Sequence, residues 1–177
     1  MIQYKAFIAS SLDGYIARKN GALDWLTSDE FKLDQDDFGY SAFIRAIDCI
    51  VMGRVTFESV LGFEPYPFVS TPVYVFTHNP DYKFESQYPI YIFNGTIKNL
   101  TTTLVKKQIR SAYVDGGKLI QHFIKERALD EITITRIPVL LGSGLPLFGD
   151  LAQDQKLEHI KTLTYPNGFV QSKYHLK

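Results

Sequence analysis

The chain has 177 residues and equal numbers of acidic and basic side chains, 19 of each, so its formal net charge at pH 7 is zero. Without a net positive field, we do not expect it to bind nucleic acid or an acidic membrane surface. Hydrophobic residues make up 45% of the sequence, which is enough for one sizeable core, and we expect a single domain over residues 1–177.

Cysteine usage and the N-terminus both favour a cytoplasmic protein. Cys49 is the only cysteine and lies in an apolar run, which predicts a buried, inert thiol and excludes an intramolecular disulfide. Residues 1–5 lead into a strand pattern without a secretory segment, and the apolar runs are too short to cross a bilayer. We expect no metal site.

In the first two thirds of the chain, strand patterns alternate with helix patterns. Ser28 before two acids predicts a helix start, and Gly39 separates it from a later helical stripe over residues 40–47. The expected strands are residues 4–9, 49–52, 73–76, 90–93 and 112–114. The other expected helices are residues 54–61, 97–104 and 119–124. This alternation predicts a mostly parallel sheet with helices on both faces.

The last third of the chain shows a different pattern. A strand period begins near Ile132, and the segments 157–164 and 169–175 flank the turn-forming residues 165–168. We therefore expect an antiparallel hairpin at the C-terminal end of an otherwise parallel α/β sheet.

Two glycine turns are the strongest functional signal. The apolar strand before Gly53 leads into a helix, and a second strand runs through Asp115 into Gly116 and Gly117 before another helix. The first turn of a helix offers free backbone N–H groups that suit a phosphate. Two such turns indicate a ligand with more than one phosphate, or a phosphate beside a ribose. Neither turn has the Rossmann or Walker glycine spacing.

Four segments, found in order along the chain, resemble the dihydrofolate reductase-like family. They are residues 9–17, 51–58, 114–117 and 129–144. The similarity is greatest to the branch that contains the reductase domain of bacterial riboflavin biosynthesis and its small stand-alone bacterial relatives. It implies a three-layer α/β fold with a mostly parallel central sheet, helices on both faces and an antiparallel C-terminal hairpin.

The resemblance also implies a reduced nicotinamide dinucleotide at the carboxyl ends of the strands. Thr77 and His78 follow a strand where relatives bind the adenosine 2′-phosphate, which favours NADPH and leaves NADH as an alternative. His78 could equally be a plain surface histidine. The expected cofactor-binding residues are Ala9, Gly53, Arg54, Val55, Thr56, Thr77, His78, Asp115, Gly116, Gly117, Lys118 and Leu119. Because Gly116 is expected to face the cofactor, Gly116→Leu should weaken NADPH binding and leave the fold intact.

Hydride transfer also requires a proton, which water or a carboxylic acid can supply. The acids near the family's catalytic helix are Asp29, Glu30, Asp34, Asp36 and Asp37, of which we take Asp29 and Asp37 as the candidate donors. Most of these acids would otherwise form a solvated face.

Asp13 and Tyr15 are the expected substrate-binding residues. The alternative for Asp13 is a turn in which the carboxylate caps nearby backbone. Tyr15 stands where riboflavin-pathway relatives carry a lysine for the ribose phosphate, and residues 62–72 lack the cation that holds the folate tail. Both departures favour a neutral, flat substrate.

These expectations describe an NADPH-dependent oxidoreductase that acts on a small heterocyclic (pterin- or pyrimidine-like) or carbonyl substrate. The alternatives are a non-catalytic nucleotide-binding module of the same fold and a riboflavin-pathway 5-amino-6-(5-phosphoribosylamino)uracil reductase. A flavodoxin-like flavin protein is disfavoured by the antiparallel end of the sheet. The apolar segments 138–141, 160–165 and 169–174 predict a homodimer, as the resemblance also implies, unless their side chains face the monomer's own core.

Overall fold

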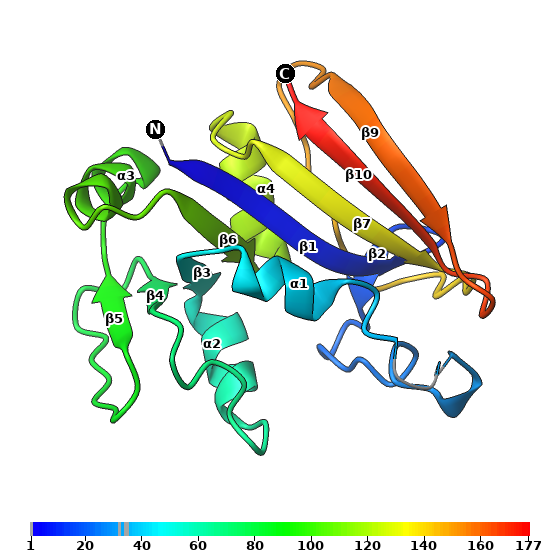
Figure 1. Ribbon diagram of the computed structural model, residues 1–177, viewed down its shortest axis with the longest axis horizontal. Coiled ribbons are helices and arrows are strands. Elements are labelled where there is room, and N and C mark those ends of the chain that lie inside the picture. The colour runs from blue at the N-terminus through cyan, green and yellow to red at the C-terminus, as the bar shows by residue number, and fades with distance from the viewer. Residues whose placement is uncertain (1, 32, 34–35) are drawn as a thin grey trace.

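The computed structural model describes residues 2–31, 33 and 36–177. The chain folds into a mixed sheet flanked by helices (Figure 1). The strands are β1 (Gln3–Ser11), β2 (Tyr15–Ala17), β3 (Cys49–Gly53), β4 (Val73–Phe76), β5 (Ile90–Phe93), β6 (Ser111–Asp115), β7 (Glu131–Ile137), β8 (Leu145–Pro146), β9 (Leu157–Thr164) and β10 (Val170–Leu176). The helices are the short 3₁₀ helix η1 (Asp29–Phe31), α1 (Tyr40–Arg45), α2 (Arg54–Leu61), α3 (Ile97–Lys106) and α4 (Gly117–Lys125).

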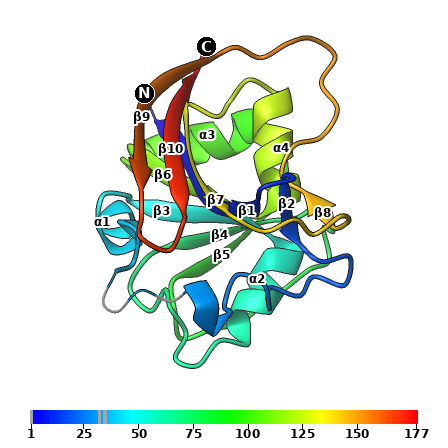
Figure 2. The same ribbon diagram turned by 90° about the vertical axis from the view of Figure 1, so that its right-hand side faces the viewer.

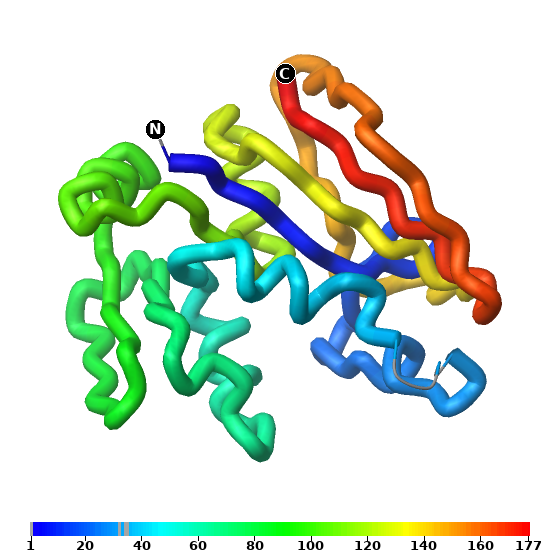
Figure 3. The backbone as a smooth tube through the Cα atoms, in the orientation of Figure 1, coloured from blue at the N-terminus to red at the C-terminus, as the bar shows by residue number. Residues whose placement is uncertain are grey.

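The main sheet has eight strands in the order β5-β4-β3-β6-β1-β7-β10-β9. The strands from β5 to β7 are parallel, and β10 and β9 are added antiparallel. β1 therefore lies between β6 and β7, as the chain path in Figure 3 shows. The expected α/β sheet with an antiparallel C-terminal hairpin is confirmed.

Helices cover both faces of the sheet (Figure 2). On one face, Leu100 and Leu104 of α3 and Phe123 of α4 share a core with Val51 and Val114. The opposite core contains Phe57 and Val60 of α2, with the aromatic side chains of α1 packed against it. Both cores are built from strand residues that alternate in direction, which is why the parallel strands are apolar on both sides.

Most elements follow the periodicities of the sequence. The bounds of α2, β4, β5 and β9 are those predicted, and the turn between β9 and β10 closes through a hydrogen bond from Gly168 N to Tyr165 O. The strand β8 was not predicted, because two residues carry no periodic signal and their partner, β2, is far away in the sequence. Within the described residues, every helix is too short or too polar to cross a membrane.

Candidate functional site

Two helices begin side by side at the carboxyl edge of the sheet. β3 leads through Gly53 into α2, β6 leads through Gly116 into α4, and these two strands are paired with Met52 opposite Asp115. No side chain caps the first turn of either helix, whereas Thr96 and Asn99 form a capping box on α3. The free N–H groups of α2 and α4 are therefore directed at one region, where they can bind an anion.

Thr56 joins the two glycine turns. A Cβ placed on Gly116 would collide with the Thr56 hydroxyl, so the second turn packs directly against the first turn of α2. Gly116 also has a φ of +98°, which L side chains rarely adopt, and a Cβ on Gly117 would collide with Ile16 of β2. The expectation that Gly116→Leu leaves the fold intact is wrong, because the added side chain meets the protein itself.

Gly53 differs from the paired glycines. Its φ is −69°, and a Cβ there would meet no atom within 4 Å. Gly53 is thus the glycine that faces open space at the edge of the sheet. This is the property required where a ligand approaches the backbone.

The other residues in the first turns of α2 and α4 differ in the groups that they can present to a ligand. Arg54 Nη1 donates to both carboxylate oxygens of Glu58, at 2.8 and 2.9 Å, and its guanidinium lies 5.8 Å from the centre of the Tyr82 ring. Val55 is exposed on α2 and Lys118 is exposed on α4. Leu119 is buried in the core, so only its backbone can face a ligand.

Beyond β4, the structure separates Thr77 from His78. Thr77 is buried, and its Oγ1 accepts a hydrogen bond from Asn79 N at 3.1 Å. His78 is exposed, and its ring lies nearly parallel to that of His122, with 6.3 Å between the centroids. Both imidazoles meet Phe76 edge-on. His78 can therefore reach a ligand, whereas the Thr77 hydroxyl holds the turn.

Asp115 carries a half-buried carboxyl group at the end of β6. The Tyr113 hydroxyl lies 3.0 Å from Asp115 Oδ1 and 3.0 Å from the carbonyl oxygen of Phe7. One hydroxyl proton cannot serve both acceptors, so when Tyr113 donates to Phe7 the second bond needs a proton on Asp115. Burial raises the pKa of Asp115, which favours that protonated form.

A cavity of about 330 Å³ lies beside Tyr40, a neighbour of this acid, although Asp115 itself is not among the residues that line it. Tyr40 lines it, and the pKa of the Tyr40 phenol is raised by burial and by the nearby charge of Asp115. Ala9, which we expected at the boundary between nicotinamide and substrate, also lines the cavity. The full lining is Phe7, Ala9, Leu26, Phe31, Leu33, Asp36, Asp37, Phe38, Tyr40, Thr135, Ile137 and Phe169.

The two candidate proton donors from the sequence fit less well. Asp37 lines the cavity, but its carboxylate accepts hydrogen bonds from Gly39 N and Ser41 N, at 2.9 and 2.8 Å. Hydrogen bonds from Ser41 hold the pKa of Asp37 below its usual value, so it is ionised near neutral pH. Asp29 is exposed on η1 and does not line the cavity, and Asp34 lies outside the described residues.

The Asp13 carboxylate accepts hydrogen bonds from the backbone of a segment far along the chain. It accepts from the Ser11 hydroxyl at 2.6 Å, from Leu141 N at 3.1 Å and from Gly142 N at 2.7 Å. Tyr15 lies on β2 opposite Pro146. Neither Asp13 nor Tyr15 is among the residues that line the cavity. The structure therefore favours the turn alternative for Asp13 and does not bring Tyr15 to the cavity wall.

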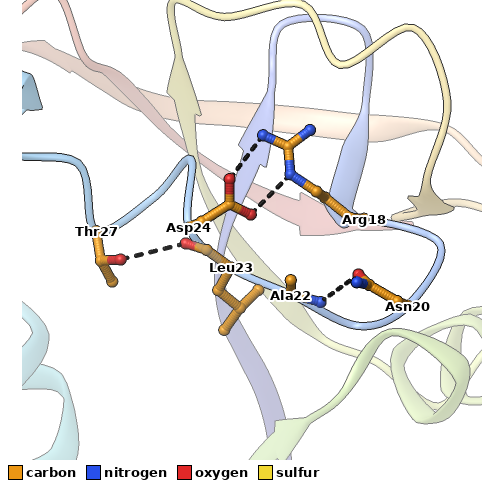
Figure 4. Close-up of polar contacts among 6 residues, drawn as sticks. All are labelled: Arg18, Asn20, Ala22, Leu23, Asp24 and Thr27. Atoms are coloured by element: carbon orange, nitrogen blue, oxygen red, sulfur yellow. Dashed lines mark hydrogen bonds and ion pairs between the residues drawn. The ribbon is translucent and has the colours of Figure 1, made fainter.

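The segment after β2 closes the far side of the cavity. Arg18 donates two hydrogen bonds to Asp24, both 2.7 Å long, across a turn in which Asn20 Oδ1 accepts from Ala22 N (Figure 4). This ion pair fixes the start of the stretch that buries Trp25 against Ile137 and Phe169. Leu26 then reaches the cavity.

Sequence reasoning placed Asp115 among the cofactor contacts and missed its pairing with Tyr113. The available signal was an acid that ends an otherwise apolar strand immediately before two glycines. The same pattern places a tyrosine two residues earlier, on the same face of the strand. The described residues contain no group of three or more His, Cys, Asp or Glu side chains placed to hold a metal ion.

Comparison with known proteins identifies the family. Residues 4–171 match the RibD C-terminal domain. The Bacillus subtilis protein YwjB is 40% identical over 153 residues, which cover 85% of each chain. The crystal structure of a putative riboflavin biosynthesis protein from Shewanella superimposes with a TM-score of 0.91 at 38% identity and covers 99% of both chains.

A more distant structure shares the fold. Dihydrofolate reductase from Enterococcus faecalis, solved with NADP(H), superimposes with a TM-score of 0.65 at 19% identity over 99% of this chain and 96% of that one. The resemblance to dihydrofolate reductase-like proteins, expected from four short segments, is confirmed. This chain belongs to the RibD C-terminal domain family.

Proposed function

We propose that this protein is an NADPH-dependent reductase of a small heterocyclic or carbonyl substrate. The observation that carries the proposal is the contact between Thr56 and Gly116, which joins two uncapped helix N-termini beside the half-buried carboxyl of Asp115. Family membership supports a reductase, as does the NADP(H) in the Enterococcus relative.

The residues present suit a dinucleotide. The first turns of α2 and α4 supply N–H groups for the pyrophosphate, Thr56 adds a hydroxyl, and Gly53 leaves open space for close approach of the backbone. We assign the exposed His78, stacked with His122, to the adenosine 2′-phosphate. When bound, the cofactor supplies a hydride.

Asp115 supplies the proton in this proposal. Burial raises the pKa of Asp115, which favours its protonated form, and the Tyr113 hydroxyl, 3.0 Å from Oδ1, orients the carboxyl group. Burial and the nearby charge of Asp115 raise the pKa of the Tyr40 phenol. Tyr40 also lines the cavity that receives the substrate in this proposal. The sequence alone predicts Asp29 and Asp37 for this role, and those two predictions are alternatives to Asp115.

The first test is NADPH binding by calorimetry to the protein and to Gly53→Val. We expect micromolar binding to the unmodified protein and at least about tenfold weaker binding to the variant, because the new side chain fills the space in front of two N–H groups. The side chain meets no protein atom, so the circular dichroism spectrum and melting temperature should not change. Equal affinity in a folded variant would rule out this placement of the pyrophosphate.

The same preparation separates a reductase from a non-catalytic nucleotide-binding module. Steady oxidation of NADPH with a pterin, a pyrimidine, a quinone or a cyclic imine supports the reductase. Tight NADPH binding without turnover of any of them supports the binding module. Turnover confined to the phosphoribosylamino-uracil would support the riboflavin-pathway alternative.

We also propose that two copies of the chain pair through β9. This strand forms one edge of the main sheet, and all eight of its residues are exposed. Ile160 and Leu163 are 44% and 42% exposed, so these apolar side chains are not covered by the monomer's own core. An unprotected apolar edge strand is commonly covered by another chain.

A further inference from the structure

The cavity lined by Tyr40 and Asp37 has a distinctive set of side chains. Its aromatic side chains come from β1, η1, the residues just before α1, α1 itself and the turn between β9 and β10. Its only charged side chains among the described residues are Asp36 and Asp37. The aromatic members are Phe7, Phe31, Phe38, Tyr40 and Phe169. A slot of this composition selects its occupant both by shape and by charge.

The rings form two connected groups around the slot. Phe169 contacts Phe31 and Phe38, with centroids 5.5 and 5.0 Å apart, and Phe7 contacts Tyr40 at 5.7 Å. Ring faces and edges at these spacings pack well against a flat, unsaturated ring and poorly against a branched or extended chain. The occupant indicated by shape is therefore a planar ring.

The charge at the rim is negative. The pKa of Asp37 is lowered by its hydrogen bonds to Ser41, and Asp36 Oδ1 accepts a hydrogen bond from Phe38 N at 2.7 Å. The pKa of Tyr165, whose ring meets Phe38 edge-on, is raised by burial and then by the charges of both aspartates. Both carboxylates therefore act on the same aromatic wall.

The described cations around the slot do not cancel this charge. Arg45, in the last turn of α1, adds a small effect on the pKa of Asp37 but does not line the cavity. Arg18 is paired with Asp24. An anionic substituent on the substrate would meet two carboxylates without a compensating cation among the described lining residues.

We propose that the substrate is a planar ring with a C=N bond and no phosphate or carboxylate substituent, bound more tightly when its nitrogen carries a proton. This inference deepens the proposed reductase function and rests on it. In the reaction, a ring that binds as the neutral imine first gains a proton on its nitrogen from Asp115, and the ring carbon then gains a hydride from the reduced nicotinamide; a ring that binds already protonated needs only the hydride. The C=N double bond becomes a C–N single bond, and the nicotinamide is oxidised by two electrons. The aromatic walls and the acidic rim both favour a delocalised cation.

Three matched probes test the charge selection. They are dihydroisoquinoline, its permanently charged N-methyl iminium ion and the same ring bearing a carboxylate. Binding can be followed without turnover, because Trp25 is the only tryptophan and packs against Ile137 and Phe169, two residues of the cavity wall. We expect the first two probes to change Trp25 fluorescence at concentrations at least about tenfold lower than the third.

The double variant Asp36→Asn, Asp37→Asn should bring the affinities of the three probes to within about threefold of one another. Asp154→Asn, an exposed acid remote from the cavity lining, is the matched control and should keep the original order. If the double variant fails to fold, the order of the probes on the unmodified protein decides the question.

Equal or tighter binding of the carboxylate probe, or no fluorescence response to any probe, would overturn the inference. Its failure can be told apart from failure of the reductase proposal. If the charge order holds but calorimetry detects no NADPH binding, the cavity is assigned correctly and the reductase function is wrong. If NADPH binds and is oxidised with anionic substrates, the reductase function is correct and the charge selection is wrong.

Discussion

Asp115 is the residue on which the proposed chemistry depends most. We predict that Asp115→Asn lowers kcat for dihydroisoquinoline by about 100-fold or more, the usual effect of losing a general acid. The N-methyl iminium ion needs no proton, so its reduction should depend far less on Asp115. Initial rates of NADPH oxidation with the two substrates measure the difference. A parallel loss with both would show that Asp115 supports the structure of the site and does not supply a proton.

The same variant has a second readout in stability. Burial raises the pKa of Asp115, so the folded state binds this proton more tightly than the unfolded state. The stabilisation is complete below the unfolded pKa, near 3.8, and is lost as pH rises through the raised folded value. The free energy of unfolding should therefore fall less in Asp115→Asn than in the unmodified protein between about pH 4 and pH 7, as urea titrations would show.

His78 is the residue that should decide the choice between NADPH and NADH. Its exposed ring, stacked with His122, lies at the end of β4 where the 2′-phosphate is expected. We predict that His78→Gln weakens NADPH binding by about three- to tenfold and leaves NADH binding unchanged. His159→Gln, on β9, is the matched control. Equal effects on both cofactors would indicate that His78 is an ordinary surface histidine with no role in cofactor selection.

At the scale of elements, the loop between α2 and β4 bears on the substrate. Residues 62–72 contain no lysine or arginine, and Tyr66 and Phe68 anchor the loop in the core. We predict that dihydrofolate is no better a substrate than dihydropteroate, which lacks the glutamate tail, with kcat/KM values within about threefold. A preference of more than about tenfold for dihydrofolate would reveal a cation that holds the tail.

Elements with a clear period could be predicted from the sequence. α2 begins after Gly53 and ends at Gly62 because both residues interrupt the apolar pattern on either side of it. The glycine turns were also predictable, since strand, glycine and helix follow one another in the chain. The alternation of strands and helices, together with the late change of period, was enough to predict a mostly parallel sheet with an antiparallel C-terminal hairpin, but not the order of the strands.

Contacts between distant segments could not be predicted. The collision partner of Gly116 is Thr56, 60 residues earlier, and the partners of the Asp13 carboxylate are 128 and 129 residues later. The raised pKa of Asp115 depends on burial that only the assembled sheet creates. The acidic segment near Asp37 could be recognised in the sequence, but its hydrogen bonds to Gly39 and Ser41 are local geometry that the sequence pattern does not determine.

At the scale of the whole molecule, the exposed edge strand predicts assembly. We expect light scattering at micromolar concentration to give a mass near twice 20.2 kDa. Ile160→Glu places a charge on the apolar edge and should shift the mass toward that of the monomer. Val105→Glu, at a position 50% exposed on α3 and outside the apolar segments of the predicted interface, is the matched control. A monomer mass that persists as concentration rises would contradict the pairing.

The central position of β1 has a consequence for how the protein is made. β1 is synthesised before the other strands of the sheet, yet its two neighbours, β6 and β7, begin at residues 111 and 131. The Asp13 turn that follows β1 needs the backbone of residues 141 and 142 to complete its hydrogen bonds. The strand therefore remains unpaired, with its apolar side chains exposed, until most of the chain has been synthesised. During this interval the nascent N-terminal segment is the part of the molecule most in need of chaperone protection.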